Sequence, residues 1–114
     1  MTKQRLVLGA AGEDLAAAWY AARGYEAVAR NWRCREGELD LIVRRGRLYV
    51  VCEVKARSSL AFGSPLEAVT EQKQRRIRRL AAQWLEGASV RAAEVRFDVA
   101  AVLAGEIEVV EGAF

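Results

Sequence analysis

Four charged residues interrupt two segments that are otherwise mostly apolar and β-branched: Glu38 and Asp40 in "GELDLIV", and Glu53 and Lys55 in "VVCEVKA". A charged side chain inside a sheet is unfavourable unless it is paired or binds an ion. Two neighbouring carboxylates can hold Mg²⁺ or Mn²⁺, which prefer oxygen ligands, and Mg²⁺ often takes only one or two carboxylates. A lysine beside them can orient water for attack, so these residue types are typical of a metal-assisted hydrolase site.

The same two segments predict a β-hairpin. Glu38–Val43 and Leu48–Ala56 have the composition of strands, and "RRGR" between them contains Gly46, which favours a tight turn. A turn centred on positions 45 and 46 places Arg44 across from Arg47. This pairing fixes the register of the charged residues.

In this register the charged residues share one face. Asp40 lies opposite Val51, and Asp40, Glu53 and Lys55 point to the same side because side chains alternate along a strand. Glu53 is the diagonal neighbour of Asp40, at about 7 to 8 Å between Cα atoms, so both carboxylates can reach a common point. Glu38 falls opposite Glu53, and we expect it either in the site or at its rim.

The alternative interpretation of these residues is structural. A Glu-x-Lys pattern in a strand is more often a surface ion pair than a catalytic site. The strand around Glu53 is so apolar, "LYVVCEV", that we expect it to be central and covered, where charge is retained mainly for a reason. This context favours the functional interpretation.

Composition excludes several other classes. The 114 residues include one Pro and no repeat or linker-like run, which predicts a single domain over residues 1–114. The absence of His excludes Ser/His/Asp and Cys/His triads, HNH nucleases and ordinary zinc sites. We expect Cys34 and Cys52 to be free thiols, with Cys52 in the core. Glu13 and Asp14 end the apolar N-terminal run, so we expect neither a signal peptide nor a membrane span, and a cytoplasmic protein.

Hydrophobic periodicity predicts the remaining elements. We expect a helix over Arg5–Arg23 with Gly24 as its stop, followed by an edge strand over residues 25–32. Thr70 is expected to cap a helix over Glu71–Glu86, and "EVRFDVAAVL" and "EIEVV" are expected to form strands. The order αβββαββ predicts an α/β domain with a mixed sheet. The expected buried stripes are Leu8, Ala11, Leu15, Ala18, Trp19 and Ala22 in the first helix and Ile77, Leu80, Ala81, Trp84 and Leu85 in the second.

Positive charge is concentrated in one segment. Residues 73–79, "KQRRIRR", carry five positive charges and no negative charge, in a chain of net charge +3. Such a block either keeps a helix face soluble or binds phosphates. Trp32 is either a core residue or a platform for base stacking. The residues that we expect to contact a nucleic-acid backbone are Arg57, Ser58, Lys73, Arg75, Arg76 and Arg79.

Several motifs together resemble a known family. Asp40, a turn and then Glu-x-Lys resembles the PD-(D/E)xK nuclease signature, with Leu39 where the literal Pro would stand. The segments "GAAGEDLAAAWYAARGYEAVARNWRCREGELDLIV", "VVCEVKARSSLAFGSPLEAVT" and "KQRRIRRLA" resemble the bacterial YraN family, and the resemblance extends from Gly9 to "RFDVAAV". It implies a restriction-endonuclease-like fold, in which helices flank a mixed β-sheet.

The resemblance also implies roles for individual residues. By it, Asp40 and Glu53 are ligands of Mg²⁺ or Mn²⁺, and Lys55 is the catalytic lysine. Glu13 corresponds to a further acidic residue that archaeal Holliday-junction resolvases carry at a similar place, although a lone Glu on a helix is most often solvated. Gln72 or Lys73, at the start of the second helix, is a further candidate for the site.

These observations favour a Mg²⁺- or Mn²⁺-dependent endonuclease that hydrolyses DNA phosphodiester bonds, with branched or repair intermediates among its candidate substrates. We expect it to recognise backbone or branched shape rather than base sequence, and two copies of the chain would suit a branched substrate. Two alternatives stay open. One is a nucleic-acid-binding module whose nuclease site is weak or inactive. The other is an interaction subunit whose charged strand residues pair with one another.

Overall fold

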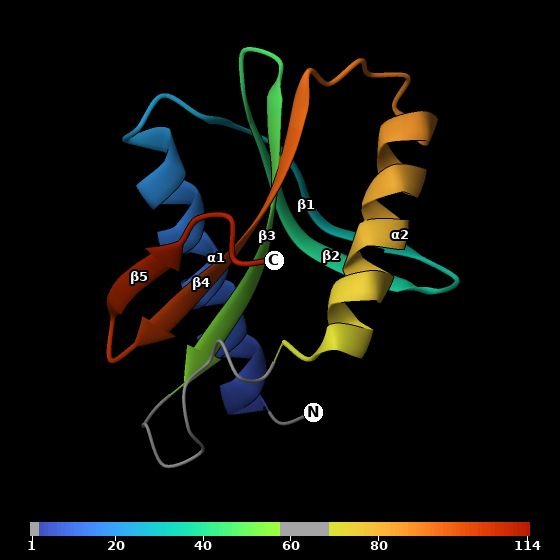
Figure 1. Cartoon of the computed structure of the whole chain (residues 1–114). Coiled ribbons are helices and arrows are strands. Elements are labelled where there is room, and N and C mark those ends of the chain that lie inside the picture. Colours follow the sequence, from blue (N-terminus) through green and yellow to red (C-terminus); the bar gives the residue numbers. More distant parts are fainter. Residues whose placement is uncertain (1–2, 58–68) are drawn as a thin grey trace.

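The computed structural model describes residues 3–57 and 69–114. The order of its elements is the αβββαββ order that the sequence predicts, with most boundaries within three residues of the expected ones. The elements are α1 (Lys3–Ala21), β1 (Glu26–Cys34), β2 (Gly37–Arg45), β3 (Leu48–Arg57), α2 (Glu71–Gly87), β4 (Glu94–Leu103) and β5 (Glu106–Val110) (Figure 1).

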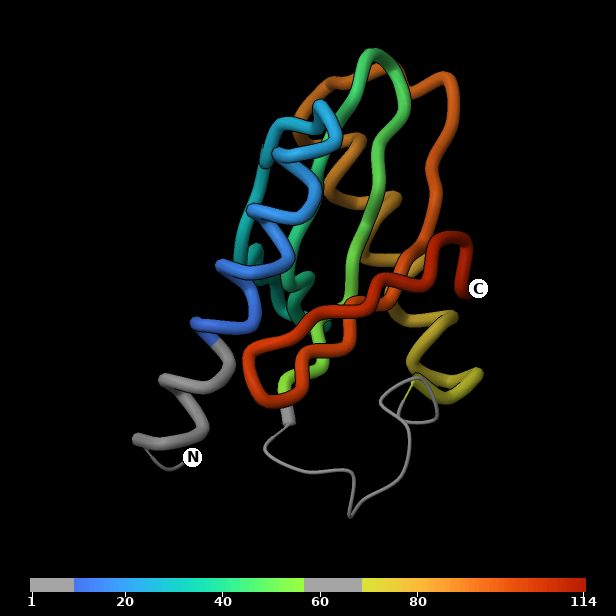
Figure 2. The backbone as a smooth tube through the Cα atoms, turned by 90° about the vertical axis from the view of Figure 1, so that its left-hand side faces the viewer, coloured from blue at the N-terminus to red at the C-terminus, as the bar shows by residue number. Residues whose placement is uncertain are grey.

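The strands form one mixed sheet in the order β1-β2-β3-β4-β5. β3 and β4 are parallel and the other neighbouring strands are antiparallel. The helices α1 and α2 lie on opposite faces of the sheet (Figure 2). β1 is an edge strand and β3, which carries Glu53 and Lys55, is central, so both expectations are confirmed. In the described ranges, no helix has the length and hydrophobicity needed to span a bilayer.

Each helix buries its own apolar cluster against the sheet. On the α2 side, Ile77 and Leu80 pack with Phe97 and other strand residues. On the α1 side, Tyr20 packs against Cys52, which is fully buried as predicted. Thr70 caps α2 as expected, because its side chain accepts the backbone N–H of the third helical residue at 3.3 Å.

The buried face of α1 differs from the predicted stripe. The helix buries Gly12, Ala16 and Tyr20, which are spaced four residues apart. A Cβ atom on Gly12 would lie 2.9 Å from the Cβ of Ala56, so only glycine allows this close packing of α1 on β3. The stripe was misplaced because a helix this rich in alanine has little contrast between its faces. Of the predicted residues, Ala11, Ala18 and Ala22 are exposed, Leu15 and Trp19 are half-buried, and the side chain of Leu8 lies outside the described residues.

The β2–β3 hairpin has a different register from the predicted one. Arg45 pairs with Leu48 and Arg44 pairs with Tyr49, so Gly46 and Arg47 form the loop. Gly46 has a φ of +61°, a conformation that favours glycine. The prediction that Arg44 lies across from Arg47 is therefore wrong, by two residues.

A shift of two residues leaves every side chain on its predicted face. Val51 pairs with Ile42 rather than with Asp40. Continued past the last regular pair, this register places Asp40 opposite Glu53 instead of diagonal to it, and Glu38 opposite Lys55. The corrected register thus brings the two carboxylates closer together than predicted.

One charged side chain, Asp98 on β4, is fully buried and was not predicted to be special. Its carboxylate accepts hydrogen bonds from the Tyr20 hydroxyl, the Arg96 guanidinium and the backbone N–H of Gly112. These donors satisfy its charge in place, and Asp98 does not line the pocket described below. We therefore assign Asp98 a structural role that ties α1 and the residues after β5 to the sheet.

Candidate active site

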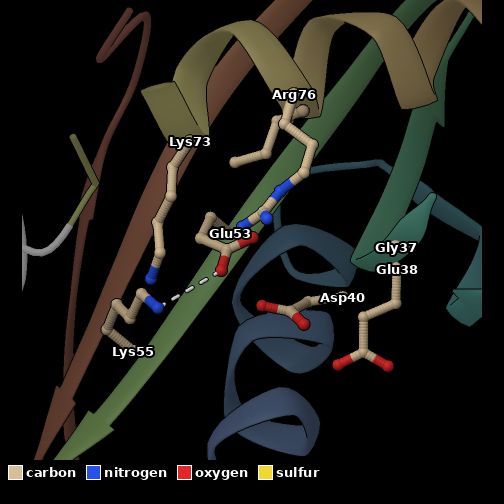
Figure 3. A pocket seen from close by; sticks show the side chains of 8 residues that line it. Gly37, Glu38, Asp40, Glu53, Lys55, Lys73 and Arg76 are labelled. Carbon is tan, nitrogen blue, oxygen red and sulfur yellow. Dashed lines mark ion pairs between the residues drawn. The ribbon is translucent and has the colours of Figure 1, made fainter. Parts of the chain in front are cut away.

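A pocket of about 350 Å³ lies between α2, the start of β2 and the second half of β3 (Figure 3). Carboxylates from the strands form one wall, and positively charged side chains from β3 and α2 form the other. The pocket brings together residues that the sequence analysis proposed from three separate elements. The lining residues are Gly37, Glu38, Asp40, Glu53, Lys55, Lys73, Arg76 and Ile77.

Asp40 faces the pocket at the point where the pairing of β2 with β3 ends. The registered pairs of β2 and β3 stop at Leu41 and Cys52. Beyond them, the backbone N–H of Val54 donates to Asp40 Oδ2 at 2.9 Å. The alternation of β2 is also irregular at this point, because Leu39 packs in the α2-side cluster and Leu41 in the α1-side cluster. In a regular strand, alternate residues would share a face.

The two carboxylates stand in an environment that disfavours their negative charge. Burial, followed by the negative charge of Asp40, raises the pKa of Glu53 to about 7. Burial also raises the pKa of Asp40, against the opposing effect of the hydrogen bond from Val54. Only 15% of the Glu53 side chain is exposed. A cation between the two carboxylates would stabilise their charged forms.

Lys55 is two residues beyond Glu53 and points to the same side of β3. Its Nζ lies 3.4 Å from Glu53 Oε1, and 21% of its side chain is exposed. The ion pair therefore contacts the pocket rather than the outer surface of the protein (Figure 3).

The first turns of α2 supply the other positive groups. Lys73 and Arg76 project from the helix toward Glu53 and Lys55 (Figure 3). The positive charge of Lys55, followed by burial, lowers the pKa of Lys73. Two such groups repel one another unless an anion lies between them, so this wall is suited to a phosphate.

Comparisons with known proteins place this chain in a family. Residues 12–102 match the model of uncharacterised protein family UPF0102. The chain belongs to this family. It is 58% identical over 96 residues to a UPF0102 protein of Beutenbergia cavernae, covering 84% of this chain and 81% of the relative. It is 52% identical over 114 residues to a UPF0102 protein of Rhodococcus jostii, covering 96% of this chain and 97% of the relative.

In this UPF0102 protein, Glu13 on α1 is not among the residues that line the pocket. Its Oε1 accepts a hydrogen bond from Asn31 Nδ2 at 2.8 Å and lies 3.7 Å from Arg30 Nη2. Burial raises the pKa of Glu13, as do the negative charges of Asp40 and Glu38, against the effects of Asn31 and Arg30. Glu13 is thus within electrostatic reach of the site but does not line it.

Glu38 lies at the rim of the pocket. It lines the opening, is about half-exposed, and pairs with Arg33 Nε at 2.8 Å through its Oε2. Glu38 was expected either in the site or at its rim, and its exposure and its pairing with Arg33 favour the rim. Trp32 packs against the α2-side cluster, which favours a core role over base stacking.

The structure describes some of the other residues that were predicted to contact nucleic acid. Arg75 and Arg79 are exposed on α2. Of the two further candidates for the site, Lys73 lines the pocket, whereas Gln72 is exposed and does not line it. Arg57 is described only as the last residue of β3, and Ser58 lies outside the described residues.

The acidic wall fits a hard divalent cation held by two protein carboxylates. In residues 3–57 and 69–114, no three His, Cys, Asp or Glu side chains gather into a ligand set. Mg²⁺ commonly takes one or two carboxylates and completes its octahedron with water and phosphate oxygens. Asp40 and Glu53 are therefore enough protein ligands for such an ion, and the ion would relieve the unfavourable burial of their negative charge.

Sequence reasoning missed one residue near the site. Asn31 lies between the registered pairs Arg30–Leu41 and Trp32–Leu39, and so stands opposite Asp40. It has a φ of +51°, which is unusual for a residue other than glycine inside a strand. Its only sequence signal is that asparagine tolerates this conformation better than most residues.

Proposed function

We propose that this UPF0102 protein is a Mg²⁺- or Mn²⁺-dependent endonuclease that hydrolyses phosphodiester bonds of DNA. One observation carries the proposal. A single pocket contains two carboxylates whose pKa is raised by burial, opposite three positive groups, Lys55, Lys73 and Arg76. This is the arrangement that a phosphodiester bridged to a divalent cation requires.

Each side chain has a role in this proposal. Asp40 and Glu53 would hold the cation, which when bound would supply positive charge to the phosphate and lower the pKa of a water molecule. Lys55, next to Glu53, would orient the attacking water and balance developing negative charge. Lys73 and Arg76 would bind the phosphate oxygens from the α2 side. The hydrogen bond from the Val54 N–H to Asp40 Oδ2 fixes the position of the Asp40 carboxylate.

A polymeric substrate is supported by charge outside the pocket. Arg75 and Arg79 are exposed on the same helix as Lys73 and Arg76, so α2 can contact more than one phosphate. Contacts of this kind recognise the backbone rather than the base sequence. We further propose that the substrate is DNA and that branched forms are preferred. We also propose that the protein acts as a homodimer in the cytoplasm.

The proposal is tested by incubating the purified protein with supercoiled, linear, single-stranded and four-way-junction DNA in Mg²⁺, Mn²⁺ or EDTA. We expect cleavage of at least one form in Mg²⁺ or Mn²⁺ and none in EDTA. In parallel, millimolar Mn²⁺ should raise the melting temperature of the wild type, and raise it less in Asp40→Asn. A wild type that shows neither cleavage nor a thermal shift would contradict the proposal.

The α2 residues give a separate prediction about binding. Replacing Lys73 and Arg76 together by Ala should weaken binding of a duplex roughly 10-fold at moderate salt and reduce the salt slope of log K by about 2, since each residue contacts one phosphate. Fluorescence anisotropy in EDTA measures this without cleavage. Arg91→Ala is the matched control for each of the single variants Lys73→Ala and Arg76→Ala, because Arg91 is an exposed arginine that does not line the pocket. Equal losses in the single variants and the control would contradict a specific role for the pocket.

A second candidate function is a nucleic-acid-binding module whose nuclease site is weak or inactive. The observation that favours it is the ion pair of Lys55 with Glu53, which engages one of the two carboxylates that are proposed to hold the cation. This candidate predicts duplex binding with the salt dependence above and no cleavage in any metal. The cleavage assay separates the two candidates.

A further inference from the structure

We infer that Asn31 is a positioning residue that holds the Glu13 carboxylate within electrostatic reach of Asp40, so that Glu13 strengthens cation binding without lining the pocket. This inference rests on the proposed function and adds a residue to it. It starts from the backbone of β1, where Asn31 is the only described residue of that strand with a positive φ.

The conformation of Asn31 is unfavourable unless its surroundings require it. A residue other than glycine is uncommon in the left-handed region, and although asparagine tolerates it better than most, such conformations cluster at functional sites as well as in turns. Asn31 stands opposite Asp40, at the point where the alternation of β2 is irregular and its pairing with β3 ends. The two irregularities are therefore one feature of the sheet, and they coincide with the acidic wall.

The side chain of Asn31 is used in this conformation. Its Nδ2 donates to Glu13 Oε1 at 2.8 Å, across from β1 to α1. Only 14% of the Glu13 side chain is exposed, so its carboxylate is held by protein partners rather than by water. Asn31 is a neutral donor, and it therefore orients the Glu13 carboxylate without cancelling its charge.

Arg30 offers Glu13 a competing partner. The Arg30 guanidinium pairs with Asp14 Oδ1 at 2.8 Å and also pairs, at 3.7 Å, with Glu13 Oε1. The shorter contact of Glu13 Oε1 is the 2.8 Å hydrogen bond from Asn31. Without the Asn31 donor, we expect the Glu13 carboxylate to move closer to Arg30, which would balance more of its negative charge and leave less of that charge to act on Asp40.

Asn31→Gly tests this inference cleanly. Glycine adopts a φ of +51° without strain, so the variant should fold with an unchanged or higher melting temperature in EDTA. Because Glu13 loses its donor, we expect Mn²⁺ to bind about 10-fold more weakly, as measured by titrating the melting temperature with Mn²⁺. Metal-dependent cleavage at subsaturating Mn²⁺ should fall by a similar factor and recover at saturating Mn²⁺.

Two further variants separate positioning from folding. Ala104→Gly is the matched control, because Ala104 has a φ of +53° and lies in the β4–β5 turn, so it relieves the same strain away from the pocket. Its Mn²⁺ affinity should equal that of the wild type. Glu13→Gln keeps the Asn31 contact but loses the charge. If Asn31 acts through Glu13, the double variant Asn31→Gly, Glu13→Gln should bind Mn²⁺ no more weakly than Glu13→Gln alone.

The outcomes distinguish this inference from the proposed function. Wild-type Mn²⁺ affinity in Asn31→Gly, or additive losses in the double variant, would overturn the positioning role and leave the metal site standing. A wild type that shows no Mn²⁺ effect on its melting temperature would overturn the metal site, and the role of Asn31 with it.

Discussion

Replacing Lys55 by Ala or Glu53 by Gln is expected to reduce metal-dependent DNA cleavage by at least about 10³-fold, equivalent to about 4 kcal/mol of transition-state stabilisation. Both side chains face the pocket, and Lys55 Nζ lies 3.4 Å from Glu53 Oε1. A glutamine at position 53 has the shape of the glutamate but lacks the charge that a cation needs. The initial rate of plasmid nicking in Mg²⁺ or Mn²⁺ measures the loss.

The two variants should differ in their response to metal. Lys55→Ala retains Asp40 and Glu53, so Mn²⁺ should still raise its melting temperature, whereas Glu53→Gln should lose most of that rise. Glu106→Gln is the matched control, since Glu106 is exposed on β5, and it should cleave like the wild type. Cleavage at the wild-type rate by Glu53→Gln would place the activity outside this pocket.

The fold was predictable where the sequence contrasts apolar with polar positions. β3 was expected to be central because Leu48–Cys52 is almost wholly apolar, and α2 was placed by its buried Ile77 and Leu80 and its Thr70 cap. The buried face of α1 was missed because its many alanines suit either face. The class of fold therefore followed from the pattern of apolar and polar residues, while the packing of α1 depends on its contacts with distant strands.

The candidate site was predictable because a strand has a period of two. The hairpin register was wrong by two residues, yet Asp40 and Glu53 remained on one face. An error of one residue would have placed them on opposite faces. What the sequence could not show is the end of the β2–β3 pairing beside Asp40, the left-handed Asn31 opposite that residue, and the position of Arg76 at the pocket. These features depend on how distant segments pack rather than on local pattern.

Glu53→Gln is also expected to stabilise the protein at pH 8 when no metal is present. The pKa of Glu53 is raised from 4.5 to about 7, so between these values the folded protein holds a proton that the unfolded chain has lost. Stability therefore falls as the pH rises from 4.5 to 7, by up to about 3 kcal/mol. The glutamine side chain of the variant stays neutral at every pH and avoids this loss.

The expected difference between Glu53→Gln and the wild type is thus near zero at pH 4.5 and about 3 kcal/mol at pH 8. For a domain of this size it corresponds to roughly 10 °C in melting temperature. The ion pair with Lys55 does not alter the sign, because it lowers the pKa of Glu53 and that pKa is nonetheless raised. Chemical unfolding in EDTA from pH 4.5 to 8 measures both the slope and the difference, with Glu106→Gln as the control.

Added Mn²⁺ should reverse the order of stability at pH 8. The ion binds the charged carboxylates of the wild type and removes the penalty, whereas the variant lacks one ligand and gains little. The opposite result in EDTA would be decisive. If Glu53→Gln were less stable than the wild type at pH 8 without metal, the pair of Glu53 with Lys55 would outweigh the effect of burial. The charged residues of β2 and β3 would then pair with one another for stability, as in an interaction subunit, and the pocket would have no need of a cation.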